Sequence, residues 1–162
     1  MTLSGRILDG VSGVLFVVAG LSLAAMALFY LYEVAARYLF GAPTIWTADA
    51  VGYTLAAVIF AALPEATRRR SHVAVDVVPS ALGPAAARAL TRLTDGAAAL
   101  ACGAAGSIAA REALRQFERG LMTNAAIPVP RWPITAMIAL GLLVAALQLA
   151  RHAARPPQGE RP

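Results

Sequence analysis

The stretch that decides the fold is residues 10–32, GVSGVLFVVAGLSLAAMALFYLY, which contains no Asp, Glu, Lys or Arg over 23 residues. A helix needs about 20 apolar residues to cross the hydrocarbon core of a bilayer, and a charge near the middle of that core is costly. The stretch therefore predicts a transmembrane helix. Arg6 and the small residues Ala25 and Ala27 would also suit a cleaved signal peptide, but the apolar run continues to Tyr32, which favours a retained helix.

Three further runs without these charged residues follow, at residues 50–64, 96–110 and 132–150. The last is long enough to span a bilayer, and the two shorter ones have flanks that can extend them. Trp46 precedes the first of these, and tryptophan favours the membrane interface. Pro84 precedes the other, and proline suits the first turn of a helix. We expect spans at about 10–32, 46–65, 93–112 and 132–151, within one membrane domain covering 1–155 and followed by a flexible tail, 156–162.

The segment between the second and third spans has its own pattern. Residues 84–95 are typical of an amphipathic helix, which can lie at the membrane interface or run directly into the third span. Within the third span, Ala99, Gly103 and Ser107 recur every four positions, a spacing that lets helix backbones pack closely in lipid. The predicted fold is an all-α integral membrane four-helix bundle with an amphipathic interfacial helix in the middle loop.

Composition agrees with a membrane protein. Of the 162 residues, 59% are apolar and 14% are charged, whereas soluble domains average about 45–50% and about 25%. A short soluble chain could not bury so much apolar surface, because small domains bury a smaller fraction of their chain. Composition therefore disfavours a soluble enzyme and an acidic disordered chain. The net charge of +5 comes from Arg residues placed between apolar runs, which disfavours a nucleic-acid partner.

Arginine also predicts the orientation in the membrane. With four spans, nine Arg fall on the side that holds both termini and the middle loop, and five fall on the other side. Because positive charge favours the cytoplasmic side, both termini are expected in the cytoplasm.

The ionisable residues lie at the span ends and in the loops. Glu33 and Arg37 are four residues apart, as are Glu65 and Arg69, and each pair can form an ion pair on one helix face. His72 and His152 lie outside the charge-free runs, so neither suits a haem ligand inside the bundle. The lone Cys102 excludes an internal disulfide. We therefore expect no enzymatic activity and no cofactor, and we interpret the chain as an accessory membrane subunit.

Three stretches resemble the small membrane subunit (DctQ type) of tripartite ATP-independent periplasmic (TRAP) transporters. The first is EVAARYLF at 33–40, followed by Pro43, Trp46 and Asp49. The second is RSHVAVD at 70–76, and the third is AIPVPRWP at 126–133. The sequence departs from the family pattern in having Asp where Glu is usual, Pro64-Glu65 at the end of the second span, and no proline before Gly141. These departures concern local helix geometry.

The resemblance implies a function. The chain would be the small permease subunit of a sodium-coupled transporter for organic acids in the bacterial inner membrane. Its partners would be a large DctM-type permease, a periplasmic DctP-type solute-binding protein and membrane lipids. The resemblance assigns structural or subunit-interface roles to Glu33, Arg37, Trp46, Asp49, His72 and Asp76. It makes Arg111, Arg115, Glu118, Arg119 and Arg131 candidates for docking the binding protein.

Two other classes remain as alternatives. A stand-alone four-helix exporter of the small multidrug type would need a carboxylate embedded in its first span, and Glu33 lies at the far end of that span. A membrane anchor for a redox enzyme would need histidine within the spans.

Overall fold

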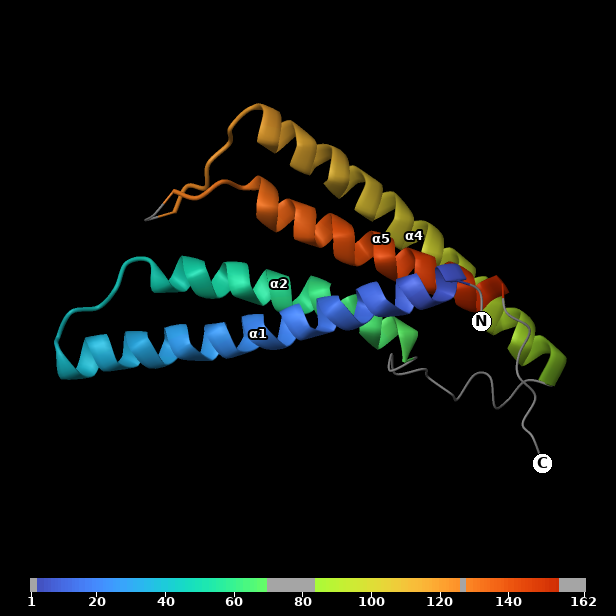
Figure 1. Ribbon diagram of the computed structural model, residues 1–162, viewed down its shortest axis with the longest axis horizontal. Coiled ribbons are helices and arrows are strands. Elements are labelled where there is room, and N and C mark those ends of the chain that lie inside the picture. Colours follow the sequence, from blue (N-terminus) through green and yellow to red (C-terminus); the bar gives the residue numbers. More distant parts are fainter. Residues whose placement is uncertain (1–2, 70–83, 126–127, 155–162) are drawn as a thin grey trace.

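The computed structural model describes residues 3–69, 84–125 and 128–154. Figure 1 shows four long helices: α1 (Leu3–Leu39), α2 (Thr47–Arg68), α4 (Pro84–Glu118) and α5 (Trp132–Ala154). All four are long and apolar enough to cross a membrane. The predicted all-α membrane fold with four spanning helices is therefore confirmed. His72, Asp76 and the tail 156–162 lie outside the described residues.

The helices extend beyond the charge-free runs from which they were predicted. α1 has 37 residues and α4 has 35. The amphipathic segment 84–95 is the beginning of α4, so it is continuous with the third span and not a separate element. Gly96 at the junction is tolerated within the helix at a cost of about 1 kcal/mol relative to alanine.

Two glycines end α1 and α4 at the same end of the molecule, which we call the turn end. Gly41 has φ +62° and Gly120 has φ +59°, a left-handed conformation that glycine adopts without a Cβ clash. The N–H of Leu121 donates to the carbonyl of Gln116 over 3.1 Å, which is the pattern of a glycine-terminated helix. The opposite end, where α1 begins and α5 finishes, we call the termini end.

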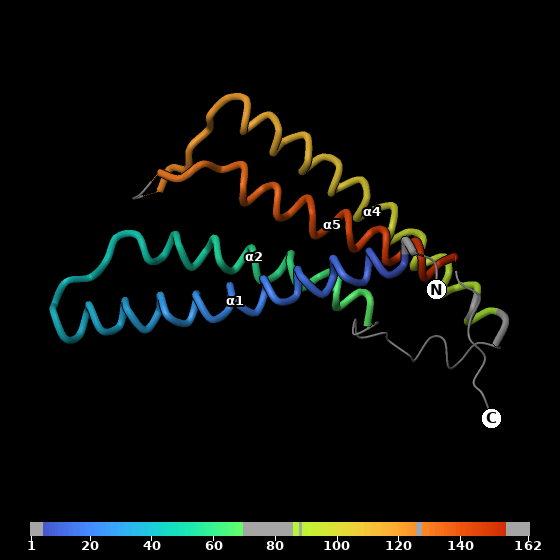
Figure 2. The backbone as a smooth tube through the Cα atoms, in the orientation of Figure 1, coloured from blue at the N-terminus to red at the C-terminus, as the bar shows by residue number. Residues whose placement is uncertain are grey.

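The helices pack in the spatial order α1, α2, α5, α4. α1 packs on α2, α2 on α5, and α5 on α4, while α1 contacts α5 only slightly. Among the described residues, α1 and α4 do not touch. Figure 2 shows the resulting two hairpins, α1–α2 and α4–α5, which lie close together at the termini end and diverge towards the turn end.

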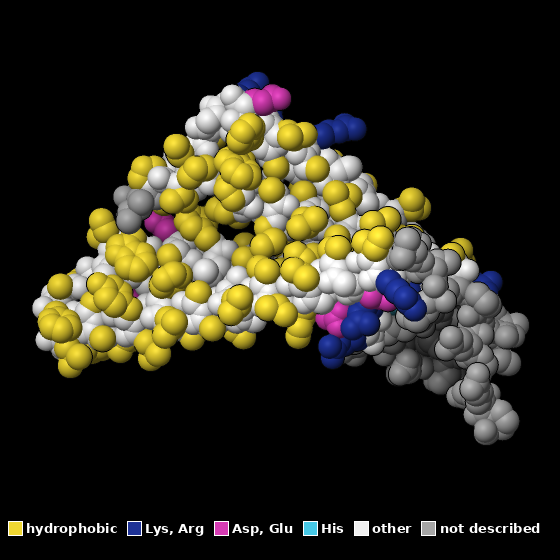
Figure 3. All heavy atoms as spheres, in the orientation of Figure 1, with side chains coloured by type: hydrophobic (Ala, Val, Ile, Leu, Met, Phe, Trp, Pro, Cys, Tyr) yellow, Lys and Arg dark blue, Asp and Glu magenta, His cyan; other side chains and the backbone are white. Residues whose placement is uncertain are grey.

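Many large apolar side chains are exposed, and they cover much of the face that Figure 3 shows in yellow. Leu21, Leu100 and Leu147 are more than half exposed, whereas the core cluster is small and includes Leu15 and Val144. Such a surface suits lipid, whose tails are as apolar as leucine. Packing between the helices therefore depends on close backbone approach and on polar contacts.

The closest backbone approach is between α2 and α5. A Cβ built on Gly141 would lie 2.1 Å from the carbonyl oxygen of Phe60. Pro64 lies within α2 one turn later, and it has no N–H to donate to the Phe60 carbonyl. Ala61 and Ala145 beside this contact are fully buried. Small residues thus allow the two hairpins to meet at this crossing.

Candidate functional site

At the turn end, Glu33 holds the connection between α1 and α2. Its carboxylate accepts hydrogen bonds from Arg37 Nη2 at 2.8 Å and from the Thr44 backbone N–H at 3.1 Å. It also contacts the Thr44 hydroxyl, which in turn contacts the hydroxyl of Thr47. Because Glu33 belongs to α1 and Thr47 begins α2, this network fixes the turn between the two helices.

Trp46 strengthens the same connection through aromatic contacts. Its ring lies 5.8 Å from that of Phe29 in an edge-to-face arrangement and 5.9 Å from that of Tyr32, centroid to centroid. Asp49 lies in the first turn of α2, where a negative charge is favourable to the helix dipole. The structure therefore brings Glu33 and Arg37 together and places Trp46 against α1.

The second polar cluster at the turn end links α4 to α5. Glu112 accepts from Arg115 Nε at 2.8 Å and from Gln116 Nε2 at 3.1 Å. The Oε1 of Gln116 then accepts from the Thr135 hydroxyl of α5 at 2.8 Å. Gln116 is buried, so this bond joins the two helices away from the surface. Gln116 was not predicted as a site residue. The signal for it in the sequence is a glutamine between the arginines near the end of α4.

The first and last residues of the loop between α4 and α5 are joined by backbone hydrogen bonds. The Thr123 N–H donates to the Val129 carbonyl at 2.8 Å, and the Arg131 N–H donates to the Leu121 carbonyl at 3.0 Å. The predicted docking residues lie around it. Arg111, Arg115 and Glu118 are exposed on the last turns of α4, Arg119 directly follows that helix, and Arg131 directly precedes α5.

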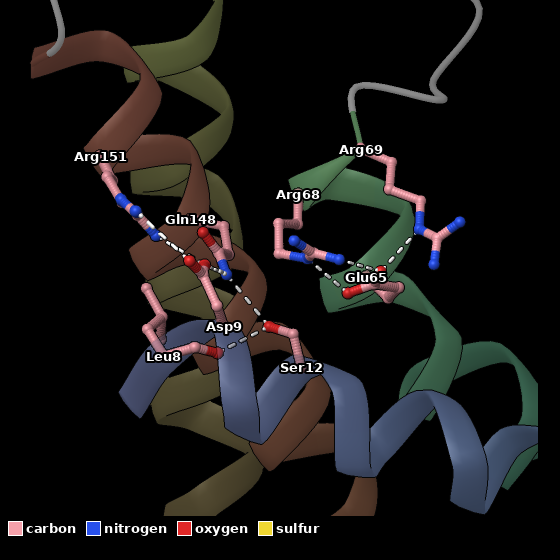
Figure 4. Close-up of polar contacts among 8 residues, drawn as sticks. All are labelled: Leu8, Asp9, Ser12, Glu65, Arg68, Arg69, Gln148 and Arg151. Carbon is pink, nitrogen blue, oxygen red and sulfur yellow. Dashed lines mark hydrogen bonds and ion pairs between the residues drawn. The ribbon is translucent and has the colours of Figure 1, made fainter. Parts of the chain in front are cut away.

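At the termini end, Glu65 of α2 is almost completely buried, with 2% exposure. It accepts from Arg68 Nε at 2.6 Å and Nη2 at 2.5 Å, and from Arg69 Nε at 2.6 Å (Figure 4). The Arg69 guanidinium also lies 5.6 Å from the ring centre of Phe16 on α1. The predicted pair of Glu65 with Arg69 is confirmed, and Arg68 is a second partner.

A fourth polar cluster joins α1 to α5. Arg151 Nη1 lies 2.6 Å from Asp9 Oδ1, and Gln148 Nε2 donates to Ser12 Oγ at 3.0 Å (Figure 4). Ser12 and Gln148 are both fully buried. The pairing could not be inferred from spacing, because the partners are 142 and 136 residues apart. The available signal was a lone glutamine near the end of an otherwise apolar run.

These clusters hold helices together at both ends and leave the middle of the bundle apolar. In the described parts of the chain, no group of three His, Cys, Asp or Glu residues is placed to hold a metal ion. The arrangement offers charged side chains at the two ends, where water or a partner protein can reach them.

Comparison with known proteins identifies one family. The sequence model of the family described as "Tripartite ATP-independent periplasmic transporters, DctQ component" matches residues 26–158. A comparison with curated proteins found no match.

Proposed function

Because this chain belongs to the DctQ family, the small permease subunits of TRAP transporters, we propose that it braces a large permease and helps to dock a solute-binding protein. The match over residues 26–158 is the observation that carries this proposal. The four apolar helices and the family make the chain a multi-pass protein of the inner membrane. The proposed partners are a DctM-type permease and a DctP-type binding protein, and the proposed cargo is an organic acid.

The distribution of charge supports a bracing role without a coupling step. The ionisable residues of the four helices lie towards the helix ends, outside the central runs 10–32, 50–64, 96–110 and 132–150, whereas proton and ion pathways place such groups within the membrane. We therefore propose that sodium coupling and substrate movement belong to the large subunit, and that this chain is not an enzyme. The same distribution disfavours the alternative of a stand-alone exporter.

The arginine count supports an orientation with both termini in the cytoplasm. The turn end would then face the periplasm, where the binding protein arrives. Docking is proposed for Arg111, Arg115, Glu118, Arg119 and Arg131. Arg119 is exposed, whereas Arg115 also pairs with Glu112 over 2.7 Å, so a substitution of Arg119 is the simpler test of docking.

Structural roles are proposed for the remaining candidates. Glu33, Arg37, Trp46 and Asp49 would shape the periplasmic end of α1 and α2, which the Glu33 network supports. His72 and Asp76 would hold the middle loop against lipid or the large subunit. The exposed apolar faces of α1 and α4 leave room for the scaffold of a large permease and for lipid.

The test is reconstitution. Proteoliposomes would contain a DctM-type permease from the same organism, with or without this chain, and would receive a DctP-type binding protein from that organism and an inward sodium gradient. We expect uptake and stable co-purification only when this chain is present. Sodium-independent uptake would contradict the coupling proposal alone. Drug export by this chain in the absence of a large permease would contradict the proposed function and favour the exporter.

A further inference from the structure

Each helical hairpin is closed at the turn end by contacts between its own two helices. In α1–α2, Glu33 holds Thr44 and thereby the start of α2. In α4–α5, Gln116 bonds to Thr135 at 2.8 Å across the helices. Figure 1 shows that the two hairpins themselves are separated at this end. Each hairpin is therefore a unit that its own contacts keep together.

The two hairpins meet elsewhere, at the crossing of α2 with α5. Gly141 lies against the carbonyl of Phe60, and Ala145 is fully buried one turn further along α5. Glycine and alanine occupy this contact, so the backbones of α2 and α5 meet there without large side chains between them. Pro64 leaves the Phe60 carbonyl without its helical donor, and proline is a usual site of helix bending. Small residues and a proline at this crossing would therefore allow α2 and α5 to rotate relative to each other.

Beyond the crossing, at the termini end, a polar latch ties α1 to α5. We define it as Asp9 and Ser12 of α1 with Gln148 and Arg151 of α5 (Figure 4). Gln148 donates to Ser12 at 3.0 Å and approaches Asp9 at 3.4 Å, and its own position is fully buried. α1 and α5 contact each other only slightly, so these polar bonds are a large part of what joins the two helices.

The latch is not fully satisfied. The Oε1 of Gln148 is buried and receives no hydrogen bond from any residue that the structure describes. A buried acceptor without a donor costs about 1–3 kcal/mol. This cost weakens the closed latch, and movement of Gln148 towards the membrane surface would relieve it.

We propose that hairpins α1–α2 and α4–α5 turn relative to each other about the Gly141–Phe60 contact, restrained by the latch at the termini end. Each hairpin remains rigid while the distance between the two turn ends varies. Rotation of packed units about the interface between them is one of the recognised kinds of conformational change. The inference concerns the chain alone and does not depend on the proposed transport role.

The test measures distances between spin labels in the full chain, reconstituted in lipid nanodiscs, with Cys102 replaced by Ala. The reporting pair joins the two hairpins at their turn ends, through Ala42→Cys and Met122→Cys, both at exposed positions. The control pair lies within one hairpin, through Ile7→Cys and Ala48→Cys, also exposed. Each pair is measured with the native latch and with Arg151→Gln.

We expect Arg151→Gln to broaden the distance distribution of the reporting pair and to leave the control pair unchanged. The double change Asp9→Arg with Arg151→Asp should restore the narrower distribution. If Arg151→Gln prevents folding, Ser12→Ala provides the same comparison, because it removes the partner of Gln148 without touching a charge. Equal broadening of both pairs, or no change in the reporting pair, would overturn the proposal.

Discussion

The carbonyl oxygen of Phe60 faces Gly141 of the neighbouring helix, at a distance that leaves no room for a Cβ. Pro64 cannot donate a hydrogen bond to that oxygen, so the carbonyl is free to face α5. A Cα hydrogen of Gly141 points at this oxygen, since it occupies the direction of the missing Cβ. Weak Cα–H···O contacts of this type recur at helix–helix interfaces.

Gly141→Ala should destabilise the protein by about 1–3 kcal/mol, because the added Cβ forces the backbones of α2 and α5 apart. Unfolding in increasing mole fractions of SDS, followed by the fluorescence of Trp46 and Trp132, would measure the change. Gly52→Ala is the matched control, since a Cβ there meets nothing within 4 Å. It should be neutral or stabilise α2 by up to about 1 kcal/mol. Equal effects at both glycines would contradict the close crossing.

Glu65→Gln should lower the melting temperature more than Glu112→Gln. Glu65 is 2% exposed and holds two guanidinium groups, so the neutral amide leaves Arg68 and Arg69 facing each other without a carboxylate. Glu112 has one arginine partner and is more accessible, and exposed ion pairs contribute little. Thermal unfolding in the same detergent compares the two variants. A larger effect at Glu112 would mean that the Glu65 cluster is not essential to the termini end.

Gln116 and Thr135 should show a positive coupling in a double-mutant cycle with Gln116→Leu and Thr135→Val. Interhelical hydrogen bonds in membrane proteins average about 0.6 kcal/mol and reach about 1.7 kcal/mol, and the buried position of Gln116 favours the upper part of this range. Unfolding free energies of the wild type, both single variants and the double variant give the coupling. Strictly additive effects would show that the bond does not join α4 to α5.

Arg119→Glu should reduce uptake by a reconstituted transporter, and the loss should shrink as ionic strength rises, because rim charges act mainly on the association rate and are screened by salt. Arg6→Glu is the control at the termini end, since Arg6 is also exposed. Its effect on binding-protein titrations should be small. An unchanged titration with Arg119→Glu at low salt would remove Arg119 from the proposed docking surface.

The sequence allowed the helices and the local ion pairs to be predicted, because both depend on short spacings. Charge-free runs located all four helices, and a separation of four residues identified Glu33 with Arg37 and Glu65 with Arg69. The pairing of Asp9 with Arg151 depends on how α1 and α5 are placed in three dimensions. A single sequence carries no periodicity that reports such a placement. The sequence did not decide whether residues 84–95 form a separate helix or continue into the third span, because an amphipathic segment and a spanning segment can join without a break.

The spacing of small residues in α4 likewise predicts less than the structure shows. Gly106 packs against Leu143 of α5 and Gly103 approaches Ala146, whereas Ser107 is exposed. The repeat Ala99, Gly103 and Ser107 indicated close packing but did not identify the glycine in closest contact. The periodicity of small residues predicts which face of α4 packs against a neighbour. Which residue on that face makes the closest contact depends on how the axes of α4 and α5 cross.

The ion pair between Asp9 and Arg151 also has a consequence for biogenesis. Its carboxylate is synthesised early and its guanidinium comes 142 residues later, so α1 must enter the membrane with Asp9 not yet paired to Arg151. The two hairpins can each assemble from neighbouring sequence, but the contact that joins α1 to α5 awaits the last helix. Completion of this contact therefore depends on insertion of the last helix, and until then the positive charge near Asp9 is that of Arg68 on α2.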